Sequence, residues 1–239
     1  MALFYPSDWR PFYFKAPYTR NLIRNCSGQD GLKHGWNILE NGGNYWKVEK
    51  DHGGSDDLPE EALALSNNVS YNFATSYGWC SMEQIIDLTK EGVSEELLDG
   101  EIQPDIVVTE WYAARFDCGN TYEMSVTLLT KPKLEKKYTL AEFNVGPVLT
   151  PQWAPRNWNK VEHVFCDYGP GLRYIRFFHK GKDTQFWAGH YGCKMAGAQV
   201  RIQFKEEMQG SRPKQREVIK SNPETQLTLK EDEDEDIYD

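Results

Sequence analysis

Histidine and cysteine side chains are the first residues in this sequence that could carry out chemistry. His163 lies three positions before Cys166, and a thiol beside an imidazole is a common nucleophilic pair. Adjacent strand positions, however, point to opposite faces, and no turn motif here would stabilise an oxyanion. His179 and His190 lack a third ligand at a spacing that suits a metal ion. We therefore expect a protein that is not an enzyme, with no metal and no cofactor.

An aromatic loop is the stronger candidate site. Phe186 and Trp187 stand just before a glycine, in the segment Cys166–Lys194. That segment begins with a strand end and the turn residues DYGPG, continues with the bulky β run Leu172–Phe178, and then reaches the loop. Trp187 is either a platform for a ligand or a loop aromatic folded onto the sheet. The residues alone leave both readings open.

Short strands are the elements that would hold this loop. Alternation of apolar and polar residues over 198–205 is typical of a strand with one buried face. The Asn-Gly of Glu40–Gly43 predicts a hairpin between the two apolar stretches that flank it. Short helices are expected at Asp57–Ala62 and Ser94–Gly100. The remaining predicted strands are Tyr71–Trp79, Ile106–Tyr112, Tyr122–Thr130, Leu140–Val145 and Val161–Cys166. This pattern indicates an all-β fold, an antiparallel sandwich or barrel, and we prefer the sandwich.

Charge is concentrated at the C-terminus. The net charge is -9, and residues 206–239 hold eleven acidic and five basic residues, a net of -6, which leaves -3 for residues 1–205. A nearly neutral body does not attract phosphates, so we expect no nucleic-acid partner. We expect the acidic segment to be disordered, because it lacks apolar residues to offset the entropy of ordering. Tyr238 within it is a possible phosphate acceptor.

The expected compartment follows from the cysteines and from the apolar runs. The five cysteines are an odd number, widely spaced and without a CxxC motif, which is typical of reduced thiols. The N-terminal residues lack the pattern of a signal peptide, and no apolar run reaches about 18 residues. We expect a cytoplasmic protein without a membrane span.

Many motifs in order resemble those of the F-box-associated domain, the substrate-binding half of the sugar-recognising F-box proteins. The match runs from about Arg10 to Lys205. It is carried by RPFYF, GW, YWKVE, the WC of Trp79-Cys80, QIIDL, EELLD, WYAARFDCG, DYGPG, RYIRF and FWAGHYG. The resemblance implies a jelly-roll-like β-sandwich of about ten antiparallel strands with two short helices. We expect a lead-in at 1–9, the β-sandwich domain at 10–205 and the acidic tail at 206–239.

The resemblance also implies a glycan site with an altered loop. Glycan-binding members have Tyr-Trp-Lys where this chain has Phe186, Trp187 and Ala188. The tryptophan there stacks on the inner sugars while its neighbours make polar contacts. Other contact regions of the family imply roles for Asp117, Phe73 and Tyr77, although Asp117 also fits a solvated turn. An F-box precedes the domain in the family, and about ten residues precede it here, so we expect the adaptor-binding helices to be missing.

These expectations give one leading function and two alternatives. The first is a non-enzymatic recognition module for a glycoprotein or protein ligand, with weakened or lost binding to the chitobiose core of N-glycans. The second is a substrate adaptor in ubiquitin-dependent, endoplasmic-reticulum-associated degradation of glycoproteins, which would make the chain a ubiquitin-ligase component. The third is an antigen-recognition receptor of fish nonspecific cytotoxic cells in innate immunity.

Overall fold

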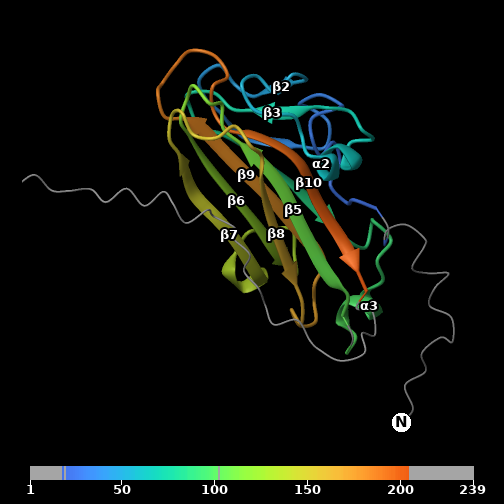
Figure 1. Cartoon of the computed structure of the whole chain (residues 1–239). Helices are drawn as coiled ribbons and strands as arrows, with labels where there is room; N and C mark the ends of the chain where they lie inside the picture. The colour runs from blue at the N-terminus through green and yellow to red at the C-terminus, as the bar shows by residue number, and fades with distance from the viewer. Residues whose placement is uncertain (1–17, 19, 102, 205–239) are drawn as a thin grey trace, which may run out of the picture.

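The computed structural model describes residues 18, 20–101 and 103–204 of the 239-residue chain (Figure 1). Within them, ten strands form two five-stranded antiparallel sheets, ordered β1-β4-β9-β6-β7 and β2-β3-β10-β5-β8. The strands are β1 (Asn37–Asn41), β2 (Lys47–Glu49), β3 (Asn72–Ala74), β4 (Cys80–Asp87), β5 (Asp105–Ala113), β6 (Asn120–Leu129), β7 (Thr139–Thr150), β8 (Asn159–Phe165), β9 (Tyr174–Asp183) and β10 (Lys194–Gln203). The predicted antiparallel sandwich of ten strands is confirmed.

Two short α-helices accompany the sheets in the part of the chain that the structure describes. Helix α3 (Glu95–Asp99) begins at Ser94, whose side chain accepts a hydrogen bond from the Leu97 N–H, as its capping sequence predicts. Helix α2 (Glu60–Leu65) begins three residues later than the predicted turn, after Pro59, a residue that cannot donate a backbone hydrogen bond and so suits a helix start. A 3-10 turn, η1 (Lys136–Tyr138), precedes β7. Among the described residues, no helix is long and apolar enough to cross a membrane.

The predicted hairpin around Glu40–Gly43 is wrong. The chain does turn there, since the Gly42 N–H bonds to the Trp79 carbonyl and the Tyr45 N–H bonds to the Gly42 carbonyl. Strands β1 and β2 nevertheless belong to different sheets, where β1 pairs with β4 and β2 with β3. An Asn-Gly signal reports a local reversal, but it does not determine which strands pair on either side.

The predicted strand Tyr71–Trp79 is likewise shorter in the structure. Only Asn72–Ala74 is extended, and Thr75 to Trp79 form a loop. The Thr75 N–H and hydroxyl both donate to the Cys193 carbonyl, which ties the start of that loop to the chain just before β10. The acidic segment 206–239, including Tyr238, and the predicted lead-in 1–9 lie outside the described residues.

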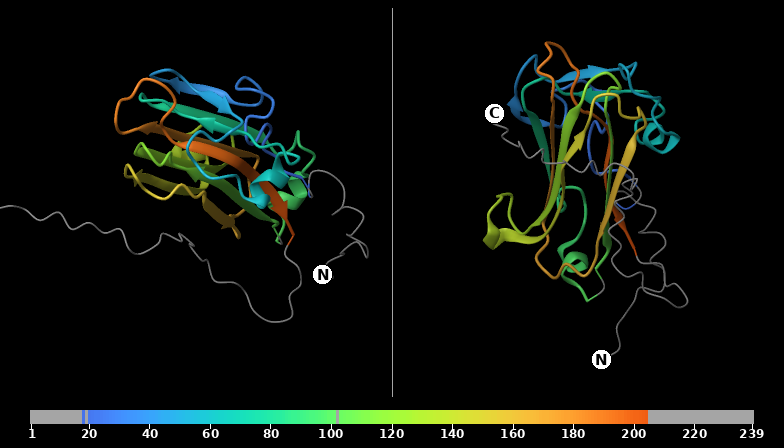
Figure 2. Two further views of the ribbon diagram at one scale, coloured as in Figure 1. Left: turned by 45° about the horizontal axis from the view of Figure 1, so that its top comes forward. Right: turned by 60° about the vertical axis from the view of Figure 1, so that its left-hand side comes forward.

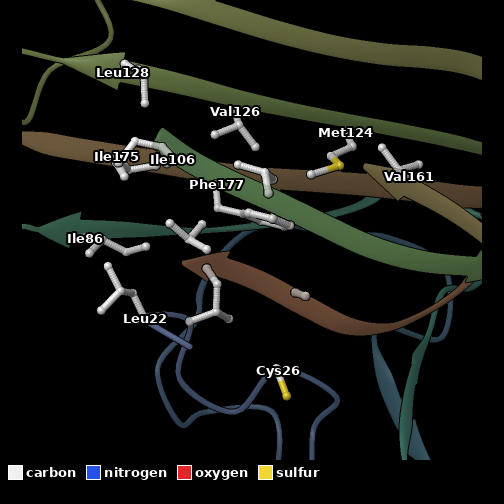
Figure 3. Packing of buried hydrophobic residues seen from close by; sticks show 14 of the residues in the cluster. Leu22, Cys26, Ile86, Ile106, Met124, Val126, Leu128, Val161, Ile175 and Phe177 are labelled. Atoms are coloured by element: carbon white, nitrogen blue, oxygen red, sulfur yellow. The ribbon is translucent and has the colours of Figure 1, made fainter. Parts of the chain in front are cut away.

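The core lies between the two sheets (Figure 3). Met124, Val126 and Leu128 alternate along β6 and are buried, as are Ile106 on the facing sheet and Phe177 on β9. Each such side chain contributes roughly 1.5–3 kcal/mol by leaving water. The two layers and the connections at their ends are seen edge-on in Figure 2.

A polar cluster crosses this core. The Glu110 carboxylate of β5 receives hydrogen bonds from the Tyr122 hydroxyl (2.6 Å) and from His179 Nδ1 (2.6 Å), which belong to the opposite sheet. All three side chains are buried, and Trp36 stacks on His179 with ring centroids 4.6 Å apart. Burial, followed by the Glu110 charge, raises the pKa of Tyr122 well above its ordinary value, so the phenol remains a donor. This cluster joins the sheets below the loops described next.

Candidate functional site

Five connections gather at one end of the sandwich, and each crosses from one sheet to the other (Figures 1 and 2). We call this the loop end. It consists of the segments 42–46, 75–79, 114–119, 151–158 and 184–193. Because the strands on both sides of each connection are fixed in sheets, residues distant in sequence are brought to one surface.

The β9–β10 connection carries the predicted aromatic pair. Asp183, the last residue of β9, accepts hydrogen bonds through Oδ1 from the backbone N–H groups of Gln185 (3.1 Å) and Phe186 (2.7 Å). This turn projects Phe186, which is 70% exposed, and Trp187, which is 41% exposed. Ala188 beside them is also exposed. Trp187 therefore keeps part of its surface open to solvent.

The far side of the same connection is tied to two neighbouring loops. The Gly189 N–H donates to Asn44 Oδ1 (2.7 Å), and the Gly189 carbonyl accepts from the Ser76 hydroxyl (2.6 Å). The backbone of Gly189 has φ of +124°, and a Cβ there would lie 2.7 Å from the Tyr191 ring. A residue other than glycine would therefore disturb both the backbone and the packing of Tyr191.

A chain of ring contacts links Trp187 to the β5–β6 connection. The Trp187 and Tyr191 rings meet edge to face, with centroids 5.7 Å apart. The Arg115 guanidinium lies 4.6 Å from the centre of the Tyr191 ring, and it also holds Asp117 through two hydrogen bonds of 2.9 and 3.0 Å. The bonds from Arg115 lower the pKa of Asp117, so that carboxylate stays charged but is already partnered.

Exposed aromatic side chains are confined to this end. Among the described residues, five Phe, Tyr and Trp side chains are exposed, and all five lie in the loop end: Tyr45, Phe116, Trp153, Phe186 and Trp187. Three of them, Tyr45, Trp153 and Phe186, have left-handed backbones with φ between 58° and 71°. That conformation is unfavourable for bulky residues, and such strain is concentrated at functional sites in proteins.

Phe116 and Trp153 form a second aromatic pair that the sequence analysis did not single out. Their rings lie 5.9 Å apart, and the Trp153 N–H donates to the Phe116 carbonyl (2.7 Å). Trp153 is 69% exposed and stands between Pro151 and Pro155, a spacing that could have marked it as a turn residue held out from the fold.

The structure separates the other predicted contact residues. Phe73 on β3 is fully buried and packs against Trp36 and Trp46, so it is a core residue. The predicted strand included Phe73, but the resemblance implied a contact role for it, whereas β3 turns its ring inward. Tyr77 lies in the loop 75–79 and is half-buried at the loop end.

A buried ion pair supports the loop end from below. Lys194, the first residue of β10, bonds to Glu49 at the end of β2, and neither side chain is open to water. Burial lowers the pKa of Lys194, and the Glu49 charge partly opposes that change. Arg115 approaches this pair across Gly53, whose added Cβ would lie 3.2 Å from Arg115 and 3.4 Å from Lys194.

The histidine and cysteine side chains pack against their neighbours and do not form a reactive group. His163 stacks on Phe143 with centroids 4.1 Å apart. Burial raises the pKa of the Cys118 thiol to about 11 and also raises the pKa of Cys193 well above its ordinary value, which disfavours a reactive thiolate at either residue. Within residues 18, 20–101 and 103–204, no group of three or more His, Cys, Asp or Glu side chains could hold a metal ion.

The structure is thus an antiparallel sandwich whose loops at one end hold exposed aromatic side chains. The chain matches the family described as "F-box associated region" over residues 13–202. It is 45% identical over 197 residues to F-box only protein 6 of Bos taurus and 42% identical over 196 residues to F-box only protein 2 of Bos taurus. The chain therefore belongs to the F-box associated family, as its motifs predicted.

The matches cover most of this chain and a smaller share of each relative. Each covers 82% of this chain, but 70% of F-box only protein 6 and 63% of F-box only protein 2. Among solved structures, TmCBM61 in complex with beta-1,4-galactotriose is similar with a TM-score of 0.40 and 12% identity, over 78% of this chain and 100% of that one.

Proposed function

We propose that the chain is a non-catalytic recognition domain whose loop end binds a glycoprotein ligand, with Trp187 as the stacking surface. The observation that carries this proposal is the exposure of Trp187 on a turn held by Asp183, Asn44 and Ser76. A fixed ring loses little conformational entropy when a sugar covers it. Membership of the F-box associated family supports a carbohydrate as the ligand.

We further propose that the affinity for the chitobiose core of N-glycans is weakened. Phe186 and Ala188 flank Trp187, and neither side chain can donate or accept a hydrogen bond. A lost neutral hydrogen bond costs about 0.5–1.5 kcal/mol and a lost charged one about 1.5–3 kcal/mol. Since each 1.4 kcal/mol is a factor of ten, these residues would weaken binding by roughly one to three such factors.

A calorimetric titration with chitobiose tests both parts. The wild-type protein should bind more weakly than micromolar, and the double variant Phe186→Tyr/Ala188→Lys should bind at least tenfold more tightly. Adding Trp187→Ala to the double variant should abolish that gain. Trp153→Ala in the same background is the matched control, because it removes another exposed tryptophan from the same end and should leave the affinity within about twofold.

Each part has its own contrary result. Micromolar or tighter binding by the wild-type protein would refute weakened affinity and leave recognition standing. No detectable binding by the wild-type protein and by the double variant would reject the sugar as the ligand of this loop. An equal loss from Trp153→Ala and Trp187→Ala would show that Trp187 is not the stacking surface.

A second candidate function is substrate recognition within a ubiquitin-ligase complex. It is favoured by the 42–45% identity to F-box only proteins over 82% of the chain. Affinity purification from cells that express the full chain should then recover a ligase adaptor. Recovery of the chain together with glycoproteins but without an adaptor would count against this role and would leave the proposed glycan site untouched.

A further inference from the structure

A groove on the outer face of one sheet lies apart from the loop end and has no assigned role. It encloses about 520 Å³ and is built by strands β5, β8 and β10, with helix α2 at one side. Its lining side chains are Glu61, Leu65, Val107, Thr109, Trp111, Lys160, Glu162, Val164, Gln199, Arg201 and Gln203. The volume lies within the range of ligand sites in proteins, roughly 300–1,000 Å³.

The position of each lining residue follows from the strand register. Thr109 on β5 is paired with Gln199 on β10 and with Glu162 on β8, so these three side chains form one row across the sheet. The next row is Arg201, Val107 and Val164. Hydrogen-bonded rows of this kind fix the side chains on one face before any ligand arrives.

Charge in the groove is balanced. Lys160 contacts Glu61 and Glu162, each at 2.8 Å, and therefore joins helix α2 to strand β8. Its ammonium lies 5.7 Å from the centre of the Trp111 ring. With Arg201 as the second cation, two positive and two negative side chains line the groove, so no net field selects an ion.

Some N–H donors in the groove are available to a ligand. The Thr109 hydroxyl is 3.4 Å from Gln199 Oε1, an arrangement that leaves the amide N–H groups of Gln199 to donate. Arg201 uses one terminal nitrogen on Gln203 (3.1 Å), and its buried Nε has no hydrogen-bond partner among the residues that the structure describes. A buried donor without a partner is costly.

We propose that this groove binds a neutral oligosaccharide. A sugar hydroxyl can accept from Arg201 or Gln199 while it donates to Glu162, which a purely anionic or cationic ligand cannot do. Trp111 lines the α2 side of the groove and is only partly buried against the cluster that contains Ala62, so its remaining surface adds an apolar wall for the C–H groups of a sugar. The site is distinct from Trp187, which lies in the β9–β10 connection at the loop end and does not line the groove.

The test is an NMR titration of the full ¹⁵N-labelled chain with maltohexaose, cellohexaose and xylohexaose, with sodium sulfate as a separate arm. At least one hexasaccharide should shift backbone amides of β5 and β10 around Thr109 and Gln199. Gln199→Ala and Arg201→Ala should each weaken that binding about tenfold or more. Trp187→Ala should leave it unchanged, which separates this groove from the proposed loop-end site.

Asn144→Ala is the matched control, because it removes an exposed amide from the edge strand β7 of the other sheet and should not alter the titration. Any of three results would overturn the proposal. These are no groove shift with any of the three hexasaccharides, shifts only at the loop end, or shifts at Arg201 with sulfate alone, which would define an anion site. Amide spectra of each variant establish that it is folded before its affinity is compared.

Discussion

The two ends of the sandwich close the same pair of sheets with different chemistry. At the loop end, four of the five connections present an exposed aromatic side chain, and the fifth, 75–79, is tied to the β9–β10 connection by the Ser76–Gly189 hydrogen bond. At the opposite end, where helix α3 lies (Figure 1), Arg173 pairs with Asp99 (2.7 Å) and Glu95 (3.0 Å), and Leu134 is an exposed apolar side chain. The opposite end pairs its surface charges within the molecule, whereas the loop end leaves aromatic rings exposed.

The difference shows which end is suited to recognition. Paired surface charges keep a connection in place and offer little to a partner, because they already have their counter-ions. Exposed aromatic rings on strained backbones are stabilised when a partner buries them. The loop end also rests on buried charges, Glu49 and Lys194, whereas the charges of the opposite end are partly solvated. Stability and binding should therefore respond differently to changes at the two ends.

The largest effect is expected from Glu49→Ala. It leaves the Lys194 ammonium buried without its counter-ion, which should lower the free energy of unfolding by about 3–5 kcal/mol. Urea denaturation followed by tryptophan fluorescence measures the loss. Lys47→Ala is the matched control, since Lys47 contacts the same carboxylate from the solvent side at 3.6 Å and should cost below about 1 kcal/mol. Equal losses for both variants would contradict the contrast between buried and exposed pairs.

The sequence predicted the scaffold better than the site. The sandwich and the cap of α3 followed from alternation and capping residues, both of which act locally, whereas the residues around Trp187 left its exposure open. The hairpin failed because strand pairing depends on the whole sheet. Phe73 failed for a related reason, since one residue of register decides whether a ring points inward or outward.

The residues that the sequence did not reveal are those whose partners lie far along the chain. Glu110 interrupts an apolar strand, and that interruption was a visible signal, but its partners Tyr122 and His179 come from the other sheet. The groove around Gln199 likewise exists only once β5, β8 and β10 lie side by side.

The next effect is expected from Asp183→Ala, which removes the acceptor that holds the turn before Phe186. Two hydrogen bonds to a carboxylate are lost, so stability should fall by about 1–3 kcal/mol and amide exchange over 184–189 should accelerate. Asp183→Asn retains an oxygen acceptor and should cost below about 0.5 kcal/mol. Burial raises the pKa of Asp183, so removal of its charge also relieves a penalty at neutral pH. Equal exchange rates in the two variants would show that this oxygen does not hold the turn.

A smaller effect is expected from Arg115→Lys. The lysine keeps the charge but loses the planar fork that holds Asp117 by two bonds and lies against the Tyr191 ring. Stability should fall by about 0.5–1.5 kcal/mol, and the fluorescence of Trp187, compared with that of the Trp187→Phe background, should become more solvent-quenched. Lys180→Arg is a suitable control, because Lys180 also lies over an aromatic ring, that of Trp79, outside the Tyr191 contact. If the Trp187 fluorescence does not change in Arg115→Lys, Arg115 does not position Trp187 through Tyr191.

The smallest effect belongs to the opposite end and should appear only in acid. Asp99 accepts bonds from Arg173 and from the Gly171 N–H (2.7 Å), and these lower its pKa to about 2. A carboxyl whose folded pKa is depressed contributes stability above its unfolded pKa, about 3.9, and that contribution is lost as pH falls toward about 2. Because the group is substantially exposed, the contribution should be below about 1 kcal/mol.

Asp99→Asn should therefore be less stable than the wild-type protein at pH 6, and the stabilities of the two proteins should converge by pH 2. Glu95→Gln, which alters the more exposed partner of Arg173, should show a smaller difference, and neither variant should change chitobiose binding. A pH-independent difference for Asp99→Asn, or an altered sugar affinity, would mean that the two ends are not as separate as their chemistry indicates.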